Sequence, residues 1–209
     1  MQDTLDFYFD CSSPWTYLAF HNVQTLARDL GVTVHWKPVL VGGIFNAINP
    51  SVYQMRENPI PAKWAYNSKD LADWTRDAGL RPILFPPRVF PVNSVKAMRA
   101  CIWLLHNDPA RFIAFTRCVF ERYWHDDQDI SQDAVLAAIA AECGIDAHAL
   151  LQGMAEPAIK EELKANTDEV IRRGGFGSPT MFVGDDMYFG NDRLVLVRSA
   201  LLRRRNGLR

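Results

Sequence analysis

The order of strands and helices at the N-terminal end of the chain restricts the fold more than any other feature. Residues 5–10 form a short, apolar and aromatic run typical of a buried strand, and residues 32–40 alternate like a second strand. Between them, Pro14 suits a first helical turn and Gly31 suits a helix end. This order predicts a βαβ unit with parallel strands and a right-handed crossover.

The C-terminal end has a different order of elements. Two short apolar runs, residues 179–184 and 187–190, flank a Gly-Asp-Asp turn signal and predict an antiparallel hairpin. A helix is expected after the hairpin, with Asn191 as its N-cap, and an amphipathic helix over residues 156–173 is expected before it.

The middle of the chain shows the 3.6-residue periodicity of helices and no strand pattern. The predicted helices cover residues 62–78, 94–106, 109–124 and 132–143, the last with Ser131 as its N-cap. A βαβ half and an αββα half separated by helices form the thioredoxin topology, an α/β fold with one mixed sheet and an all-helical insertion. The predicted boundaries are 1–60 for the first half, 61–153 for the inserted helical domain and 154–209 for the second half.

Composition and charge argue against several classes of protein. The chain has 209 residues, 48% of them hydrophobic, and a formal net charge of -1, so it has no general attraction to nucleic acid or to anionic membranes. The arginines at 203–205 are expected to be solvated at a helix end. The first nine residues are too short and too acidic for a signal peptide, and no apolar run approaches the roughly 20 residues that span a bilayer. We therefore predict a cytoplasmic protein with no nucleic-acid or membrane partner.

The cysteines form neither a metal-binding pattern nor a dithiol motif. Cys11, Cys101, Cys118 and Cys143 are widely separated and include no CxxC, so free thiols are expected. Cys11 ends the first strand, where a buried cysteine behaves as a small hydrophobe. Residues 125–127 (His-Asp-Asp) are expected to form a solvated loop, because adjacent residues rarely converge on one ion without distant partners. No metal site is predicted.

The turn between the first strand and the first helix carries the candidate chemistry. In the thioredoxin topology a reactive group sits at the N-terminus of this helix, where free N–H groups and the helix dipole stabilise an anion. Disulfide oxidoreductases place Cys-x-x-Cys there, whereas this chain has Ser13-Pro14-Trp15-Thr16. A dithiol cycle at this turn is therefore excluded. The hydroxyls could instead stabilise a thiolate that a cofactor, glutathione, brings in, although serine is also a common helix cap.

Two further motifs are expected to meet this turn in the folded chain. A cis bond between Ser178 and Pro179 would direct the backbone of Ser178 toward the first helix, where an extended tripeptide could pair with it. An ordinary trans proline in a loop is the alternative. Asn191 and Asp192 start the last helix, where a carboxylate and free N–H groups could bind the charged γ-glutamyl end of glutathione. Taken alone, these two residues are better explained as a helix cap and a first-turn acid.

The two ends of the chain resemble the 2-hydroxychromene-2-carboxylate isomerase family, which is close kin of the kappa-class glutathione transferases in the DsbA-like branch of the thioredoxin superfamily. The resemblance rests on "DFYFDCSSPWTYLA" and "GSPTMFVGDDMYFGNDRL", and it extends over nearly the whole chain. It implies a DsbA-like fold, glutathione as the cofactor and a homodimer. The residues that match the family's glutathione contacts are Ser13 beside the sulfur, Asn49, Lys63, Ser178, Pro179, Asn191 and Asp192.

The resemblance also implies a reaction. Members of the family interconvert 2-hydroxychromene-2-carboxylate and trans-o-hydroxybenzylidenepyruvate in aromatic catabolism. Physically, this reaction needs reversible thiolate addition to a conjugated system, rotation about the loosened bond, and loss of the thiolate. Ser13 would stabilise the thiolate by a hydrogen bond and need not act as a covalent nucleophile.

The substrate end of the site departs from the family pattern. A lysine after the second strand is expected to meet the substrate carboxylate, but Phe45 stands at that position. Arg56 and Lys63 are the candidates to replace it, and Asn93 belongs to an Asn-Ser pair that the family shares. We expect a small aromatic or electrophilic substrate near these residues.

Three alternative functions fit parts of the same pattern. A kappa-type transferase would use the same thiolate to join glutathione to another electrophile. A non-catalytic thioredoxin-like module would also lack CxxC, since the fold alone does not fix function. Thiol oxidoreduction through Cys11 alone would require a glutathionylated intermediate.

Overall fold

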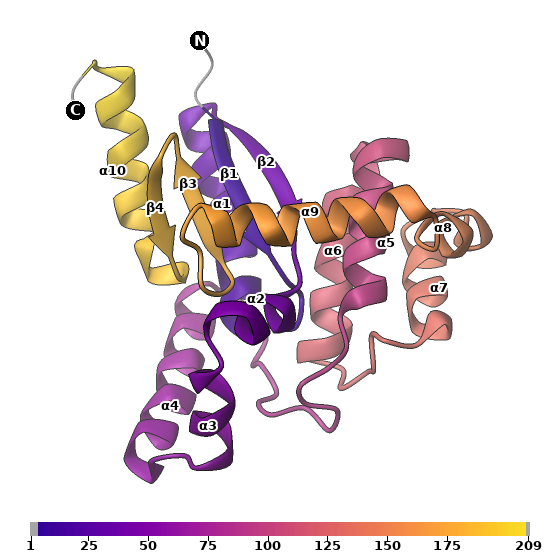
Figure 1. Ribbon diagram of the computed structural model, residues 1–209, viewed down its shortest axis with the longest axis horizontal. Helices are drawn as coiled ribbons and strands as arrows, with labels where there is room; N and C mark the ends of the chain where they lie inside the picture. The colour runs from indigo at the N-terminus through magenta and orange to yellow at the C-terminus, as the bar shows by residue number, and fades with distance from the viewer. Residues whose placement is uncertain (1–3, 208–209) are drawn as a thin grey trace.

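The sheet has four strands in the order β2-β1-β3-β4 (Figure 1). The computed structural model describes residues 4–207. Strand β1 (Thr4–Phe9) pairs in parallel with β2 (Thr33–Pro38) and antiparallel with β3 (Thr180–Val183), which forms a hairpin with β4 (Asp186–Phe189). The predicted parallel pair, C-terminal hairpin and mixed sheet are confirmed.

Helix α1 (Pro14–Leu30) connects β1 to β2 and ends where the sequence predicts. Gly31 adopts a left-handed conformation with φ of 60°, and its N–H donates to the carbonyls of Ala27 and Arg28. Glycine adopts this conformation without the steric cost of a Cβ, so it closes the helix. The remaining helices are α2 (Val41–Ile48), α3 (Ser51–Glu57), α4 (Pro61–Asp77), α5 (Val95–Asn107), α6 (Pro109–Trp124), α7 (Asp133–Glu142), α8 (Ala147–Gly153), α9 (Pro157–Arg172), the short 3₁₀ helix η1 (Asn191–Arg193) and α10 (Leu194–Arg205).

The segment after β2, for which the sequence predicts no helix, forms the two short helices α2 and α3. Helix α2 contains Gly42 and Gly43, and glycine lowers helix propensity by about 1 kcal/mol per residue relative to alanine. Its apolar residues Val41 and Ile44 are buried, which compensates for the glycines. Tertiary packing therefore forms a helix that propensity alone does not predict.

Two details of the predicted helical region also differ from the structure. Helix α7 begins at Asp133 with Gln132 at the N-cap position, so Ser131 is not its cap. The backbone N–H of Ser131 instead donates to Asp129 Oδ1 at 3.0 Å, which forms a turn before the helix. Helix α8 was not predicted, and Asp146 caps it by accepting two backbone N–H bonds.

The core is continuous between the sheet and helices α5 to α9. The ring of Phe112, from α6, lies 6.1 Å from that of Phe9 on β1 and 5.6 Å from that of Trp36 on β2. Helix α9 contacts α5, α2 and β2, so it connects the middle of the chain to the sheet (Figure 1). The domain boundaries near residues 60 and 153 remain predictions.

Helices α3 and α4 project from the rest of the molecule (Figure 1). Helix α3 buries no side chain, and α4 buries only Leu71 and Thr75. Helix α4 contacts α1, which begins at the candidate turn. None of the helices within residues 4–207 is long and apolar enough to cross a membrane.

Candidate active site

Ser13 caps helix α1 and touches the loop before β3. Its backbone is extended, with φ of -112° and ψ of 124°, and its Oγ accepts a hydrogen bond from the Thr16 N–H at 3.2 Å. The same hydroxyl donates to the carbonyl of Ser178 at 3.2 Å. No acidic residue lies in the first turn of α1, so no carboxylate on that turn opposes an anion there. The turn and the loop therefore meet as the sequence predicts.

The Ser178–Pro179 peptide bond is cis, and hydrogen bonds fix this loop on several sides. Ser178 Oγ accepts the Asp10 N–H at 2.9 Å and shares a hydrogen bond with Thr16 Oγ1 at 2.8 Å. The carbonyl of Pro179 accepts the N–H of Gly190 at 3.1 Å. Ser178 is buried, so these bonds are shielded from water and hold the loop against the first turn of α1.

Asp10 is a buried acid beneath this turn, and the sequence analysis did not select it. Its carboxylate accepts the Ser12 N–H at 2.9 Å and the Val41 N–H at 2.8 Å. Burial raises the pKa of the Asp10 carboxyl, and these two hydrogen bonds act in the opposite direction. A further hydrogen bond from the Ser94 side chain lowers the pKa as well. A carboxylate at the end of an apolar strand, directly before a reactive turn, is the signal that could have found it.

A first pocket, which we call the Asn191 pocket, has a volume of about 330 Å³. Asn191 is 4% exposed, its Oδ1 accepts from Asn22 Nδ2 at 3.0 Å, and its own Nδ2 is buried with no partner among the described residues. An unpartnered buried amide is costly, so this donor is suited to a ligand. The pocket is lined by Trp15, Asp70, Trp74, Ser178, Pro179, Phe189, Gly190, Asn191, Asp192 and Arg193.

Asn191 is not the N-cap of the last helix, contrary to the sequence prediction. Gly190, with φ of 100°, leads into the 3₁₀ turn η1, so Asn191 occupies a helical position before α10 begins. Its side chain therefore points to α1 and bonds to Asn22 instead of the helix backbone. Asp192 forms an ion pair with Arg193 at 2.5 Å at the pocket edge.

A second pocket, the Phe45 pocket, has a volume of about 230 Å³ and shares Trp15, Ser178 and Phe189 with the first. Ser13 lines it together with Arg56 and Gly177. A Cβ on Gly177 would lie 2.9 Å from the Phe189 ring, so glycine lets this ring approach the loop. Six of the residues that line it are aromatic: Trp15, Phe45, Trp64, Phe85, Phe90 and Phe189.

Arg56 lies over two of these rings. Its guanidinium carbon is 5.7 Å from the centre of Phe45 and 5.3 Å from the centre of Phe90, within the range of cation–π attraction. No carboxylate within residues 4–207 pairs with Arg56. The structure thus places an available cation beside Phe45, where the sequence lacks the expected lysine.

The other candidate residues lie around these pockets at different distances from them. Asn93 lines a smaller cavity of about 190 Å³ that shares Phe45 and Arg56 with the Phe45 pocket. Its Oδ1 accepts the Val95 N–H at 3.1 Å at the start of α5. Asn49 lines neither pocket, but its amide donates to the carbonyl of Phe176 at 3.3 Å, in the loop before Ser178.

Lys63 and Cys11 do not line the pockets. Lys63 is exposed on the first turn of α4, next to Trp64, which does line the Phe45 pocket. Cys11 is fully buried in the core, where burial and the neighbouring Cys101 raise the pKa of its thiol well above the usual value. A buried, protonated thiol is a poor nucleophile, which disfavours redox chemistry at Cys11.

Comparison with known proteins identifies the family of the chain. The family model described as a DSBA-like thioredoxin domain matches residues 4–202. The chain belongs to this family. Similar proteins include 2-hydroxychromene-2-carboxylate isomerases and kappa glutathione S-transferases.

Two relatives and one solved structure show how similar the chain is to these proteins. The 2-hydroxychromene-2-carboxylate isomerase of Pseudomonas putida is 30% identical over 197 residues, which cover 94% of this chain and 93% of the relative. The human glutathione S-transferase kappa 1 is 26% identical over 95% of this chain and 90% of its own length. A solved structure of a 2-hydroxychromene-2-carboxylate isomerase superposes with a TM-score of 0.81 at 30% identity, covering 98% of each chain. These relatives support an enzyme with isomerase-type or transferase-type activity.

Proposed function

We propose that this DSBA-like enzyme is a glutathione-dependent isomerase that interconverts 2-hydroxychromene-2-carboxylate and trans-o-hydroxybenzylidenepyruvate. The observation that carries the proposal is the meeting of Ser13, at the N-terminus of α1, with the cis Ser178–Pro179 loop and an aromatic pocket that contains Arg56. The similarity to isomerases of this name supports the reaction.

The residues of the Asn191 pocket fit glutathione. The buried Nδ2 of Asn191 needs an acceptor, which an α-carboxylate provides, and Asp192 offers a carboxylate for an ammonium group. The cis loop at Ser178 offers backbone groups to an extended peptide. Asn49 and Lys63 are proposed as additional contacts at the edge of the site.

Each residue around Ser13 has a defined chemical role in the proposal. When bound, glutathione supplies a thiolate nucleophile that adds reversibly to a conjugated substrate. The Ser13 hydroxyl rotates from the Ser178 carbonyl to donate to the sulfur, and the N-terminus of α1 lowers the thiol pKa further. Ser13 thereby stabilises the negative charge on the sulfur without forming a covalent bond to the substrate.

The Phe45 pocket is proposed to bind the substrate. Its aromatic walls suit a planar ring system and exclude water from the reacting atoms. Arg56 can pair with the substrate carboxylate, and Asn93 can donate a hydrogen bond from the adjoining cavity. Phe45 then contacts the Arg56 guanidinium, and Arg56 supplies the positive charge that the expected lysine would have supplied.

A kappa-type transferase acting on another electrophile is the second candidate, since a human kappa transferase is also similar. The available cation at Arg56 favours a carboxylate substrate, and hence the isomerase. The test is to incubate the enzyme with glutathione and either the chromene carboxylate or 1-chloro-2,4-dinitrobenzene, and to follow absorbance. Glutathione-dependent isomerisation supports the proposal, whereas conjugation without isomerisation contradicts it.

We also propose a cytoplasmic homodimer. Large apolar side chains are exposed on two separate helical surfaces, with Met55 and Tyr66 each 62% exposed and Val195 66% exposed. Val195, Leu196 and Leu202 are all exposed on α10, and a contiguous exposed apolar patch often marks an interface. Light scattering after size-exclusion chromatography should give twice the mass of the chain, and a concentration-independent monomer mass would contradict the dimer.

A further inference from the structure

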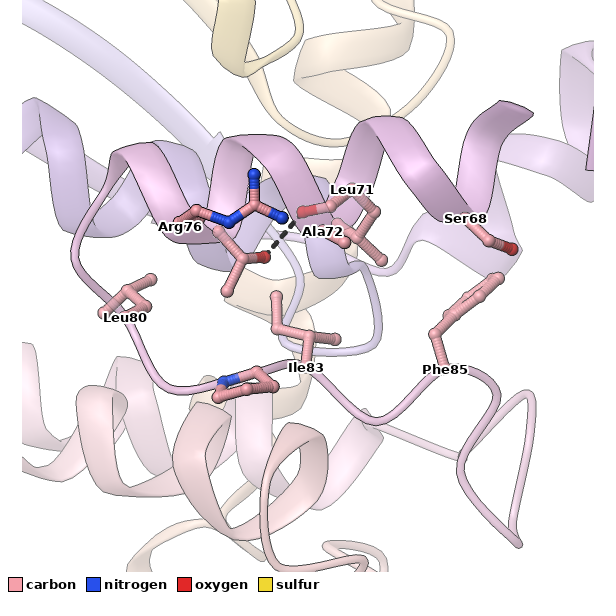
Figure 2. A pocket seen from close by; sticks show the side chains of 9 residues that line it. Ser68, Leu71, Ala72, Arg76, Leu80, Ile83 and Phe85 are labelled. Carbon is pink, nitrogen blue, oxygen red and sulfur yellow. Dashed lines mark hydrogen bonds between the residues drawn. The ribbon is translucent and has the colours of Figure 1, made fainter. Parts of the chain in front are cut away.

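Another cavity lies between helix α4 and the segment that follows it (Figure 2). We call it the α4 pocket. Its volume is about 280 Å³, and its walls are Ser68, Leu71, Ala72, Thr75, Arg76, Leu80, Pro82, Ile83 and Phe85. Figure 2 shows Phe85 at one end, facing Ser68, while Leu80 closes the other end.

The polar groups of the α4 pocket are already engaged within helix α4. The Thr75 hydroxyl donates to the Leu71 carbonyl at 2.6 Å, and the Ser68 hydroxyl donates to the Trp64 carbonyl at 3.1 Å. The Arg76 guanidinium pairs with Asp73 at 3.1 Å. What remains available to a ligand is apolar surface, so the α4 pocket suits an uncharged hydrocarbon group.

Phe85 separates the α4 pocket from the Phe45 pocket. It lines both cavities and is the only residue common to their walls among the described residues. Its ring lies 5.5 Å from Trp64 and 5.3 Å from Phe90, and both of these rings face the Phe45 pocket. Removing the Phe85 ring would therefore join the two cavities.

We propose that Phe85 sets the length of the substrate, and that the α4 pocket receives the extra ring of a longer substrate once the phenyl group is removed. This inference rests on the proposed function, because it assigns the Phe45 pocket to the substrate. The Phe85 ring is also 6.3 Å from Trp124, which is fully buried in the core, so neighbouring rings hold it in place. The enzyme with Phe85 accepts two fused rings and rejects three.

The test compares two substrates, 2-hydroxychromene-2-carboxylate and its benzo-fused three-ring analogue. Phe85→Ala should raise the ratio of kcat/KM for the three-ring over the two-ring substrate by about tenfold or more, the effect of relieving a steric block in an apolar pocket. Phe85→Leu, which keeps an apolar side chain against Trp124, should give a smaller rise. Both variants should retain the circular dichroism of the parent protein.

Ala72 offers a matched control, because it lines the α4 pocket but not the Phe45 pocket. Ala72→Phe fills the α4 pocket and should leave turnover of the two-ring substrate within about twofold, since it contacts none of the proposed reacting groups. In Phe85→Ala/Ala72→Phe the substrate ratio should return to the parent value. Equal changes for both substrates in Phe85→Ala, or an unchanged ratio in the double variant, would overturn the inference.

A binding measurement separates this inference from the proposed function. If the parent protein isomerises neither substrate, the proposed function fails, and the pocket is tested by calorimetry with naphthalene-2-carboxylate and phenanthrene-2-carboxylate. Phe85→Ala should then bind the three-ring probe about tenfold more tightly than the parent does, with Ala72→Phe reversing the gain. No selective gain for the three-ring probe would refute the assignment of Phe85.

Discussion

The segments around Ser13 are joined by buried and part-buried hydrogen bonds, whereas the aromatic side chains around Arg56 are partly exposed and held by ring contacts. The first region brings together the end of β1, the start of α1 and the loop before β3. The second is formed by α2, the projecting helices α3 and α4, and the irregular segment before α5. The sulfur side of the proposed site is therefore the more constrained of the two.

This difference suggests a division of roles. A thiolate needs donors held in fixed positions, because charge stabilisation depends on preorganised hydrogen bonds. A planar substrate needs mainly apolar area and one cation, which tolerate small shifts of the walls. Substitutions in the first region should therefore damage stability and rate together, and substitutions in the second should change substrate preference.

The largest effect is expected for Asp10→Ala. The substitution leaves the part-buried N–H of Ser12 and the buried N–H of Val41 without an acceptor, each at a cost of about 1–3 kcal/mol. The free energy of unfolding in urea should fall by about 3 kcal/mol in total. Asp168→Ala, which removes an exposed ion pair with Lys164, is the control and should cost less than about 1 kcal/mol. Equal losses for the two variants would contradict a special role for the buried carboxylate.

The pH dependence of stability tests the same carboxyl group. Burial raises the pKa of Asp10 in the folded state above the ordinary value of 3.8, so the folded protein binds this proton more tightly than the unfolded chain does. The resulting stabilisation is complete below 3.8 and is lost as pH rises through the raised pKa. Asp10→Asn carries a pH-independent amide, so the stability of the parent relative to this variant should decrease with rising pH. A flat difference from pH 3.8 upward would contradict the shift.

Ser13→Ala should have the next largest effect, on the rate. Loss of one hydrogen bond to a charged sulfur costs about 1.5–3 kcal/mol, which lowers kcat by roughly 10- to 100-fold. The pKa of bound glutathione, followed by thiolate absorbance against pH, should rise in this variant. Ser13→Thr keeps the hydroxyl and should retain most of the activity. An unchanged thiol pKa in Ser13→Ala would leave Ser13 as a helix cap only.

The elements that surround the sulfur side could be predicted because each has a local signal. Pro14 and Gly31 bound a periodic helix, and the Gly-Asp-Asp turn marks the hairpin. The hydrogen bonds that join these elements could not be predicted from the spacing of residues along the sequence. Ser178 meets Asp10 across 168 positions of the chain, and only the packed sheet brings them together.

The substrate side was harder to predict, because its residues depend on tertiary packing. Helix α2 contains two glycines and forms only because it buries Val41 and Ile44. The helix places Phe45 under the guanidinium of Arg56, a contact that an ungapped comparison of loops does not reveal. The sequence identified Arg56 and Lys63 as candidates to replace the expected lysine, but it could not choose between them.

Arg56→Gln should change substrate preference more than overall rate. It removes the cation near Phe45 and Phe90, so KM for the chromene carboxylate should rise by about tenfold, a typical effect of losing a charge-assisted hydrogen bond. Activity toward the uncharged 1-chloro-2,4-dinitrobenzene should stay within about twofold of the parent value. Arg56→Lys keeps the charge without the planar fork and should be intermediate. Equal losses of activity on both substrates would show that Arg56 supports the structure of the pocket and does not bind the substrate carboxylate.

The smallest effect is expected for Lys63→Ala. The size of this effect tests whether the projecting helices α3 and α4 stay apart from the sulfur side of the site when the ligand binds. Lys63 is exposed on α4 and has no carboxylate partner within residues 4–207. An exposed charge contributes about 0.2–1 kcal/mol, so glutathione affinity measured by calorimetry should fall by less than about fivefold, and the loss should diminish at high salt. Lys69→Ala on the same helix, where the lysine pairs with Asp73, is the control and should leave the affinity unchanged. A salt-insensitive loss above tenfold would mean that α4 moves to enclose Lys63 against the ligand, because only a desolvated contact is worth that much. In that case the two regions of the site would close as one unit, and the contrast between a fixed sulfur side and a separate substrate side would not hold.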